Sequence, residues 1–192
     1  QKTDLIELPI GHSFPDFRDY RDGVSAFEDI TAFMPNPVHL GARGLTPERT
    51  WVELVTPSYF EVAKVGAQMG SFFEPNQETA GPPAFVLSHG YWQRRFGGDP
   101  QIVGQVLTLN GESFTVVGVA PESFKGLSWG MAVSGWVPSG ATAVLLGDAT
   151  FLDNREAPAW RIMGRLQDGE TLKSVRAQVE VVAERLVAEY PF

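Results

Sequence analysis

The sequence contains no cysteine among its 192 residues. This absence excludes thiol catalysis, thiolate metal sites and disulfide bonds, but it assigns no compartment, because periplasmic and cytosolic proteins alike can lack cysteine. Cations are also scarce, since 15 Lys and Arg stand against 23 Asp and Glu for a formal net charge of −8. Without clustered cations the chain is unsuited to nucleic acid, and equally to docking on anionic lipid through a basic patch.

Long apolar runs are missing as well. No run approaches the roughly 20 apolar residues that a helix needs to cross a bilayer. Apolar residues nevertheless make up 43% of the chain and aromatic residues 11%, which is enough for the core of one ordinary domain or of two small lobes. The chain begins at Gln1 and not at Met, so we expect it to be a piece of a longer protein.

The clearest pattern in the chain begins at the apolar run 84–87, which is too short for a helix and predicts a buried strand. Ser88 then has the side chain of a helix N-cap, and the helix that follows ends at the glycine pair Gly97 and Gly98. Asp99 and Pro100 continue as a turn. We therefore expect a strand, a short helix and a turn in immediate succession.

A β-hairpin is predicted next, with strands at 105–109 and 113–119 joined at Asn110 and Gly111. Both residues of a type I′ turn need positive φ, which Asn tolerates and Gly permits freely. A two-residue loop also fixes the register, so that alternate residues of the two strands share one face. The apolar face is made by Leu107, Leu109, Phe114 and Val116.

The remaining pattern predicts further strands and helices. They are a strand at 4–8, a helix from Ser13 with Asp16 in a capping box, strands at 27–34 and 38–42 around Pro35-Asn36-Pro37, an edge strand at 135–138, a strand at 160–166 and an amphipathic helix at 171–189. We place no regular structure on residues 121–134. Because strands and helices mix without a regular βαβα alternation, the predicted fold class is α+β.

Candidate chemistry is sparse. His12, His39 and His89 have no His or carboxylate partner at a metal-ligand spacing. Ser88 and His89 are adjacent, but neighbouring side chains point apart on most backbones, so a helix cap beside a surface imidazole is favoured over a nucleophile and its base. The sequence predicts no catalytic residue, no cofactor-binding residue, no metal ligand and no cofactor.

Three clusters have both an ordinary and a functional interpretation. The carboxylates of Asp16, Asp19 and Asp22 favour a solvated helix face over a calcium site. Arg94 and Arg95 favour ordinary helix-surface charges, with Trp92 packed inward, over a patch that anchors a partner. The third cluster favours core filling and leaves open an exposed apolar groove for a ligand or partner; it consists of Phe72, Phe73, Phe124, Trp129 and Met131.

Four blocks of sequence carry a family resemblance. They are FPDFRDYRD at 14–22, VTPSYFEV at 55–62, VLSHGYWQRRFGGDP at 86–100 with the Asn110-Gly111 hairpin, and RL at 165–166 with Gly169, TL at 171–172 and EYP at 189–191. In this order and spacing they resemble the MacB-like periplasmic core domain of ABC transporter permeases of the MacB and FtsX-like type. The chain departs from that pattern at Ser71, where Arg is usual, and at Ser174.

The resemblance implies a two-lobed fold. A membrane-proximal βαβ lobe of porter-like type, residues 1–48 and 140–192, would be interrupted by a distal β-rich, sabre-like lobe, residues 49–139. It also implies a place on the periplasmic side of the bacterial inner membrane, in an integral membrane protein, where the domain relays ATP-driven motion to export of a substrate. The resemblance implies that the chain itself is not an enzyme, and that ATP hydrolysis belongs to a separate nucleotide-binding domain, since this chain has no P-loop. We expect the helix at 171–189 to act as the strut.

The implied partners are the transmembrane helices of the same parent chain, a cognate ATP-binding subunit or domain, a second permease copy in a dimer, and a periplasmic adaptor or cargo. The alternative is a periplasmic ligand-sensing or partner-docking module that is not engaged in transport. The permease interpretation requires one hydrophobic helix upstream of this domain and at least three downstream. A hydrolase would depend only on scattered Ser, His and Asp residues and is disfavoured.

Overall fold

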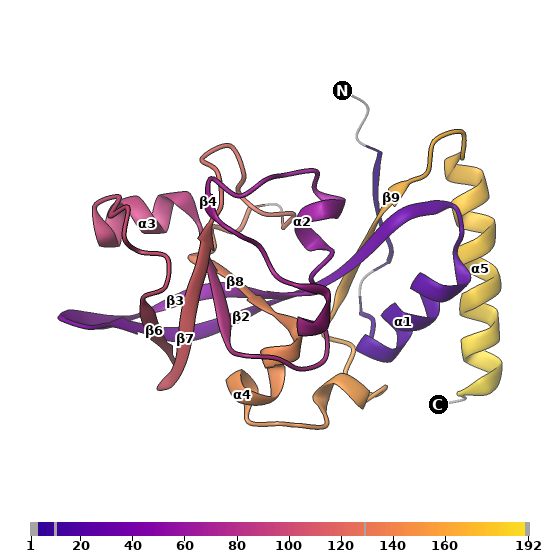
Figure 1. Ribbon diagram of the computed structural model, residues 1–192. Helices are drawn as coiled ribbons and strands as arrows, with labels where there is room; N and C mark the ends of the chain where they lie inside the picture. Colours follow the sequence, from indigo (N-terminus) through magenta and orange to yellow (C-terminus); the bar gives the residue numbers. More distant parts are fainter. Residues whose placement is uncertain (1–3, 10, 129, 191–192) are drawn as a thin grey trace. The chain divides into compact units, whose positions relative to one another are not determined.

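The computed structural model describes residues 4–9, 11–128 and 130–190, which form two compact units. Unit 1 comprises Gln1–Ala32 and Thr150–Phe192, and unit 2 comprises Phe33–Ala149. Both units mix helices with strands (Figure 1), so the predicted α+β class is confirmed. Within the described residues, no helix is both long enough and apolar enough to cross a membrane.

Unit 1 contains a small sheet and two main helices. Its strands adjoin in the order β1-β9-β2, and β1 pairs with β9 in antiparallel register. The elements are β1 (Leu5–Glu7), α1 (Phe14–Gly23), the first residues of β2 (Phe27–Ala42), the 3-10 helix η3 (Phe151–Asp153), β9 (Arg161–Leu166) and α5 (Leu172–Glu189). Because β1 ends this strand order, its edge away from β9 has no neighbouring strand among the described residues.

Helix α1 begins as the sequence predicts. The Ser13 hydroxyl accepts a hydrogen bond from the Asp16 amide at 3.2 Å, and the Asp16 carboxylate accepts one from the Ser13 amide at 2.9 Å. This reciprocal capping box satisfies two amides that a helix N-terminus would otherwise leave unpaired. Phe14 and Phe17 are fully buried, and the Phe14 ring lies 5.0 Å from that of Trp160. One face of α1 thus fills the core of unit 1.

Helix α5 also has its predicted cap, since the Thr171 hydroxyl accepts a hydrogen bond from the Ser174 amide at 3.2 Å. Of the apolar positions that define its stripe, Val175 and Val182 are buried. Leu172 is 54% exposed, so the start of the stripe does not belong to the core. The predicted helix is confirmed, but its apolar side is only partly covered by unit 1.

Unit 2 is built on a mixed sheet in the strand order β2-β3-β8-β5-β7-β4, and β6 pairs with both β2 and β7. Its strands are the second part of β2, β3 (Leu45–Val55), β4 (Met69–Gly70), β5 (Ala84–Leu87), β6 (Val106–Leu109), β7 (Glu112–Val119) and β8 (Gly135–Pro138). Its helices are α2 (Tyr59–Val62), η1 (Pro75–Gln77), α3 (His89–Phe96), η2 (Ser139–Ala141) and α4 (Thr142–Leu146). Residues 121–134 contain no helix or strand among those described, as predicted.

The predicted hairpin of β6 and β7 is confirmed in its turn, register and apolar face, and each strand begins within one residue of the predicted position. Asn110 and Gly111 have φ values of 52° and 91°, as a type I′ turn requires. Leu109 lies opposite Glu112, and the predicted apolar face is buried. Val106, on the other face, is 54% exposed.

The two strands predicted at 27–34 and 38–42 are in fact one, β2, and the separation at Pro35-Asn36-Pro37 is wrong. His39 exchanges hydrogen bonds with Asn110, so its backbone N–H points away from β3. Residues two apart point the same way, and the nitrogens of both prolines therefore also face away from β3. No ladder hydrogen bond is lost, which is why proline is tolerated here.

The prediction that residues 135–138 form an edge strand is also wrong. Strand β8 lies between β3, to which it is parallel, and β5, to which it is antiparallel. All four of its residues are buried. Because β8 has a partner strand along each edge, it is an interior strand of the sheet. Pro138 is tolerated there because it is the last residue of the strand.

The close approach of β8 to β5 predicts a strong response to Gly135→Ala. A Cβ on Gly135 would overlap the carbonyl oxygen of Val86 and would lie 2.6 Å from the Phe85 ring. We expect the free energy of unfolding to fall by about 2 kcal/mol or more. The matched control is Gly90→Ala, because a Cβ on Gly90, in α3, meets no atom within 4 Å.

We expect the control to be neutral or to stabilise the protein by about 0.5–1 kcal/mol through helix propensity. Chemical denaturation followed by circular dichroism measures both variants. Equal stabilities for the two alanine variants would contradict the position of β8.

Candidate functional site

The three histidines lie apart from one another along the chain and in the fold. His12 forms an isolated β-bridge with Trp160, His39 is an exposed residue of β2, and His89 begins α3. In the part of the chain that the structure describes, no group of three or more His, Cys, Asp or Glu side chains could hold a metal ion. The histidines therefore do not assemble into a common site.

Ser88 is a helix cap. Its hydroxyl accepts a hydrogen bond from the Tyr91 amide at 3.3 Å, and its backbone ψ of 145° is extended. The His89 ring lies 3.5 Å from the Gln93 side chain, one turn further along α3. The interpretation of this pair as a cap and a neighbouring imidazole is confirmed.

Arg94 and Arg95 are ordinary charges of the α3 surface. The Arg95 guanidinium donates a hydrogen bond to the Thr46 carbonyl at 2.7 Å, and both arginines lie within 4.0 Å of the Glu48 carboxylate. Trp92 is 5% exposed, so it packs inward as predicted. These contacts attach α3 to the first residues of β3.

The aromatic residues around positions 72 and 124 pack against the core of unit 2. Phe72 stacks on Phe60 with ring centroids 3.7 Å apart, and Phe124 lies 5.4 Å from Trp136. Phe73 is 7% exposed. Core filling is confirmed for Phe73, whereas Phe72 and Phe124 are partly buried and pack on the core by their rings. Met131 is also only partly buried, and Trp129 lies outside the described residues.

A buried carboxylate lies at the centre of unit 2. Glu53, on β3, has no exposed surface. Its Oε2 atom accepts hydrogen bonds from the Tyr59 hydroxyl at 2.7 Å and from Trp136 Nε1 at 2.9 Å. Its Oε1 atom accepts a hydrogen bond from the Ser128 hydroxyl. Three donors from three separate segments thus converge on one side chain.

The network around Glu53 holds residues 121–128, which contain no helix or strand. Besides the bond from Ser128, the Leu127 amide donates to the Tyr59 hydroxyl at 2.8 Å. Burial, together with the Glu53 carboxylate, raises the pKa of Tyr59 well above 10, so the hydroxyl keeps its proton for donation. In the sequence Glu53 alternates with the apolar Val52 and Leu54, a pattern that predicts an exposed carboxylate and not a buried one.

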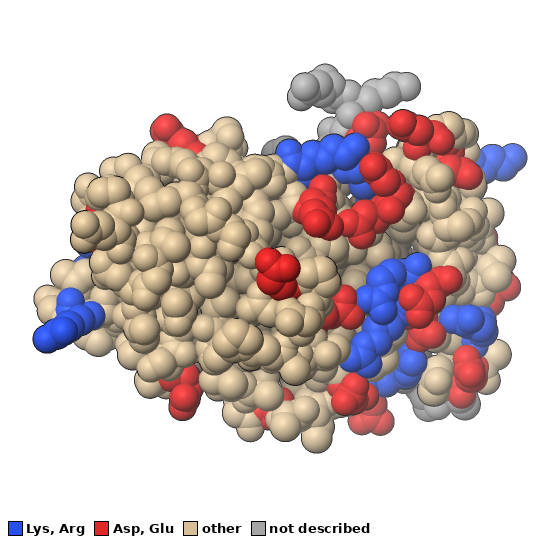
Figure 2. All heavy atoms as spheres, in the orientation of Figure 1, with Lys and Arg blue, Asp and Glu red and all other residues tan. Residues whose placement is uncertain are grey.

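In unit 1, a second polar cluster joins α1 to α5. The Arg155 guanidinium binds Asp16 at 2.7 Å and Asp19 at 2.9 Å, and Arg185 of α5 binds Asp19 at 3.2 Å. Figure 2 shows acidic and basic side chains intermingled in this part of unit 1. The prediction of a solvated carboxylate face is therefore wrong for Asp16 and Asp19, which are ion-paired and about three-quarters buried.

Two further contacts hold α5 along its length. The Gln178 side chain accepts a hydrogen bond from the Ala26 amide at 3.1 Å. Gly23, at the end of α1, lies so close to Val182 that an added Cβ would come within 2.7 Å of it. Together with the Arg185 ion pair, these contacts fix α5 to the segment 13–26 at three successive turns.

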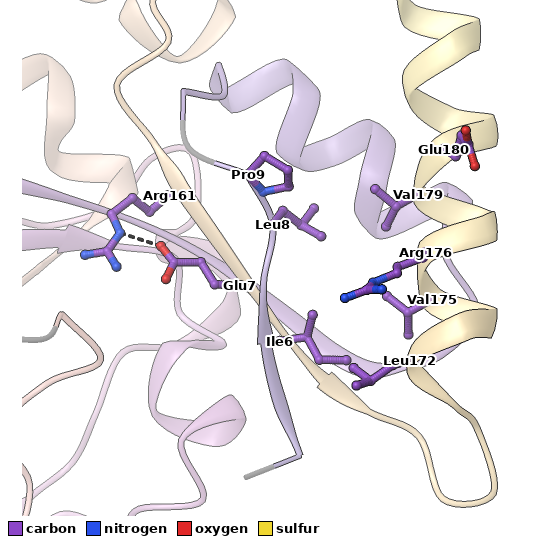
Figure 3. A pocket seen from close by; sticks show the side chains of 10 residues that line it. All are labelled: Ile6, Glu7, Leu8, Pro9, Arg161, Leu172, Val175, Arg176, Val179 and Glu180. Carbon is purple, nitrogen blue, oxygen red and sulfur yellow. Dashed lines mark hydrogen bonds and ion pairs between the residues drawn. The ribbon is translucent and has the colours of Figure 1, made fainter.

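A groove of about 760 Å³ lies between β1 and α5, entirely within unit 1 (Figure 3). Its walls are formed by Ile6, Glu7, Leu8, Pro9, Arg161, Leu172, Val175, Arg176, Val179 and Glu180. Glu7 and Arg161 form an ion pair at 2.7 Å. The sequence predicted the helix that forms one wall, but not that a strand 165 residues earlier forms the other, since β1 and α5 come together only through the sheet.

Residues 3–182 match the family model of the MacB-like periplasmic core domain. The chain belongs to this family. The resemblance carried by the four sequence blocks is thereby confirmed. The family is that of the periplasmic domain of MacB-like and FtsX-like ABC permeases, so the domain comes from a class of membrane transport proteins.

Two curated proteins of Pseudomonas fluorescens are similar to this MacB-like domain, and each is named "Probable export ATP-binding/permease protein". The protein of strain Pf0-1 is 25% identical over 188 residues, which are 92% of this chain and 28% of that protein. The protein of strain Pf-5 is 26% identical over 131 residues, which are 68% of this chain and 19% of that protein. The chain thus spans under a third of the length of these relatives.

Solved structures share the fold at low sequence identity. The periplasmic region of MacB from Actinobacillus actinomycetemcomitans has a TM-score of 0.69 at 13% identity, over 94% of this chain and 75% of that one. The extracellular domain of the transporter YknZ from Gram-positive bacteria has a TM-score of 0.70 at 15% identity, over 97% and 94%. A domain of a putative permease protein from Porphyromonas gingivalis scores 0.67 at 15% identity, over 91% and 71%.

The donors around Glu53 predict that position 53 needs an acceptor. In Glu53→Met the Trp136 indole and two hydroxyls lose their buried partner, and we expect the free energy of unfolding to fall by about 3 kcal/mol. In the matched variant Glu53→Gln, the amide oxygen still accepts from Tyr59 and Trp136, and the amide nitrogen donates to Ser128. We expect a loss of at most about 1 kcal/mol from this variant. Urea denaturation compares the two, and equal losses would refute the role of acceptor.

His12 predicts a pH dependence of stability. It packs edge-on against Tyr20 at 5.2 Å, and burial lowers its pKa below 6.5, against smaller opposing effects of Pro9 and Asp16. The neutral ring is therefore favoured in the folded state, so this stability is complete above pH 6.5 and is lost as the pH falls toward the lower folded pKa.

We expect His12→Gln to remove this part of the decline in unfolding free energy below pH 6.5. The exposed His39→Gln is the control and should keep the wild-type slope. Denaturation between pH 8 and pH 5 at constant ionic strength tests this, and parallel pH profiles for wild type and His12→Gln would contradict it.

Proposed function

We propose that this chain is the periplasmic, extracytoplasmic domain of an ABC transporter permease in the bacterial inner membrane. In this proposal it catalyses no reaction and relays ATP-driven conformational change to the export of a substrate or to a periplasmic partner. Support comes from the family match and from the relatives, which are named as export ATP-binding/permease proteins. ATP hydrolysis belongs to another part of the transporter, since this sequence has no P-loop.

The observation that carries the proposal is the attachment of α5 to the rest of unit 1. A helix transmits motion to a lobe only if the two move together. Arg185, near the end of α5, binds Asp19 of α1, and Gln178 and Val182 hold the helix at two earlier turns. We therefore assign α5 the role of the strut.

The partners in this proposal are the transmembrane helices of the parent chain, its cognate ATP-binding subunit or domain, a second permease copy, and a periplasmic adaptor or cargo. The membrane-proximal lobe is assigned to residues 1–48 and 140–192 and the distal lobe to 49–139. The compact units suggest boundaries at Ala32/Phe33 and Ala149/Thr150 instead. One observation favours the alternative of a ligand-sensing or partner-docking module, namely the groove between β1 and α5.

The test uses the parent permease as a dimer in nanodiscs, with a spin label at Val106→Cys, which is 54% exposed. Electron spin resonance measures the distance between the two labels without nucleotide and with ATP and vanadate. We expect the distance to change on ATP binding in the wild type. An ATPase-active permease whose label distance never changes would overturn the proposed function.

The strut is tested by Arg155→Gln combined with Arg185→Gln, which removes the ion pair between Arg185 of α5 and Asp19 of α1 together with the two ion pairs that Arg155, a residue outside α5, makes with the same face of α1. We expect ATPase activity within about twofold of wild type and a label-distance change reduced by about half or more. Lys173→Gln, an exposed cation of the same helix, is the matched control and should behave as wild type. A full distance change in the double variant would dismiss the strut while leaving the proposed function in place.

A further inference from the structure

The groove between β1 and α5 has walls of hydrocarbon. Ile6, Leu8 and Pro9 line it from the β1 side, and Leu172, Val175 and Val179 line it from α5. Figure 3 shows the Ile6 and Leu8 side chains turned toward α5 and the three α5 side chains turned toward β1. A volume of about 760 Å³ lies within the range of pockets that take small ligands.

One cation faces this groove without a partner. The Arg176 side chain reaches from α5 toward β1 (Figure 3). Among the described residues, it forms no ion pair or side-chain hydrogen bond. Its neighbour Glu180, one turn along α5, also lines the groove, and in the same view its side chain does not reach toward Arg176 or β1. The other cation in the wall, Arg161, is already bound to Glu7. Arg176 is therefore the charge available to a ligand.

This combination specifies the ligand's chemistry. A hydrocarbon chain would cover the six apolar side chains, and an anionic head group would receive a charge-assisted hydrogen bond from the Arg176 guanidinium. A ligand chain over the groove also removes water from Arg176, which costs free energy unless an anion accompanies it.

An extended peptide fits less well. A peptide would add to the open edge of β1, but β1 has only the three residues Leu5–Glu7. In an antiparallel pair the backbone groups of alternate residues point outward, so two residues at most would offer hydrogen bonds to an added strand. A site of this kind would contribute little backbone pairing.

We propose that the groove between β1 and α5 binds a single-chain anionic amphiphile, with the chain between Ile6 and Val179 and the head group on Arg176. The site goes beyond the proposed function, because it depends only on contacts within unit 1. It can therefore stand or fall whether or not the domain relays motion.

The probe is decanoate below its micelle concentration, measured by isothermal titration calorimetry with the 192-residue chain, and 1-decanol is the uncharged probe of equal chain length. We expect saturable one-site binding of decanoate. Amide chemical shifts in residues 5–9 and 172–180 should move with the same saturation, and those around Glu53 should not. Absence of saturable binding would overturn the proposal, as would shifts confined to other residues.

Two pairs of variants separate the head group from the chain. Arg176→Gln should weaken the affinity for decanoate about tenfold, which is the loss expected for one charge-assisted hydrogen bond. The affinity for decanol should not change. Lys173→Gln makes the same charge change outside the groove and should bind as wild type. Leu172→Gln should weaken the binding of both probes. Val181 is 67% exposed and lies outside the groove, so Val181→Gln should weaken the binding of neither. Equal weakening by Arg176→Gln and Lys173→Gln would contradict the site.

Other occupants give different outcomes. Binding to phosphatidylglycerol vesicles that requires Arg176, without binding of monomeric decanoate, would mean a membrane contact and would overturn the proposal. A chain that sediments as a dimer, becomes monomeric on Leu172→Gln and does not bind decanoate would mean that a second copy fills the groove. Either result replaces the amphiphile with another partner.

Discussion

The attachment of α5 to α1 is the interaction that holds the two main helices of unit 1 together. One guanidinium, that of Arg155, holds two carboxylates that lie one turn apart on α1, and Asp19 also holds Arg185 of α5. Asp16 additionally caps the helix through its second oxygen. Asp16 therefore helps to start α1, and Asp19, one turn later, fixes the neighbouring helix. Partial burial strengthens these pairs relative to fully exposed ones, because less water screens them.

In unit 2, hydrogen bonds to one side chain, Glu53, hold a segment that has no helix or strand among its described residues. Residues 121–128 contain no helix or strand, and they are held by the hydrogen bond from Ser128 to the carboxylate and by that from the Leu127 amide to the Tyr59 hydroxyl. The donors are two hydroxyls and an indole, so the carboxylate acts as an acceptor at the centre of the network. A buried carboxylate with three donors satisfies the rule that buried polar groups must be hydrogen-bonded.

The groove between β1 and α5 lies on the helix that is proposed as the strut. If α5 is the strut, a ligand in the groove contacts the element that carries motion, through Leu172, Val175 and Arg176. An occupied groove would stiffen the contact between α5 and β1, since apolar surface that is now in water would be covered. Ligand binding and motion could thus be coupled through one helix without any change of fold.

Local patterns determined much of this protein. The Asn110-Gly111 turn, the Ser13 and Ser88 caps and the α5 periodicity each follow from interactions between residues near one another in sequence, which is why the sequence predicted them. Tertiary structure decided whatever depends on distant neighbours. The central place of β8 follows from its pairing with β3 and β5. The continuity of β2 through two prolines depends on the side on which its partner β3 lies. Glu53 can be buried because hydrogen-bond donors up to 83 residues away reach it. A sequence specifies which groups need partners, and only the folded chain determines which partners reach them.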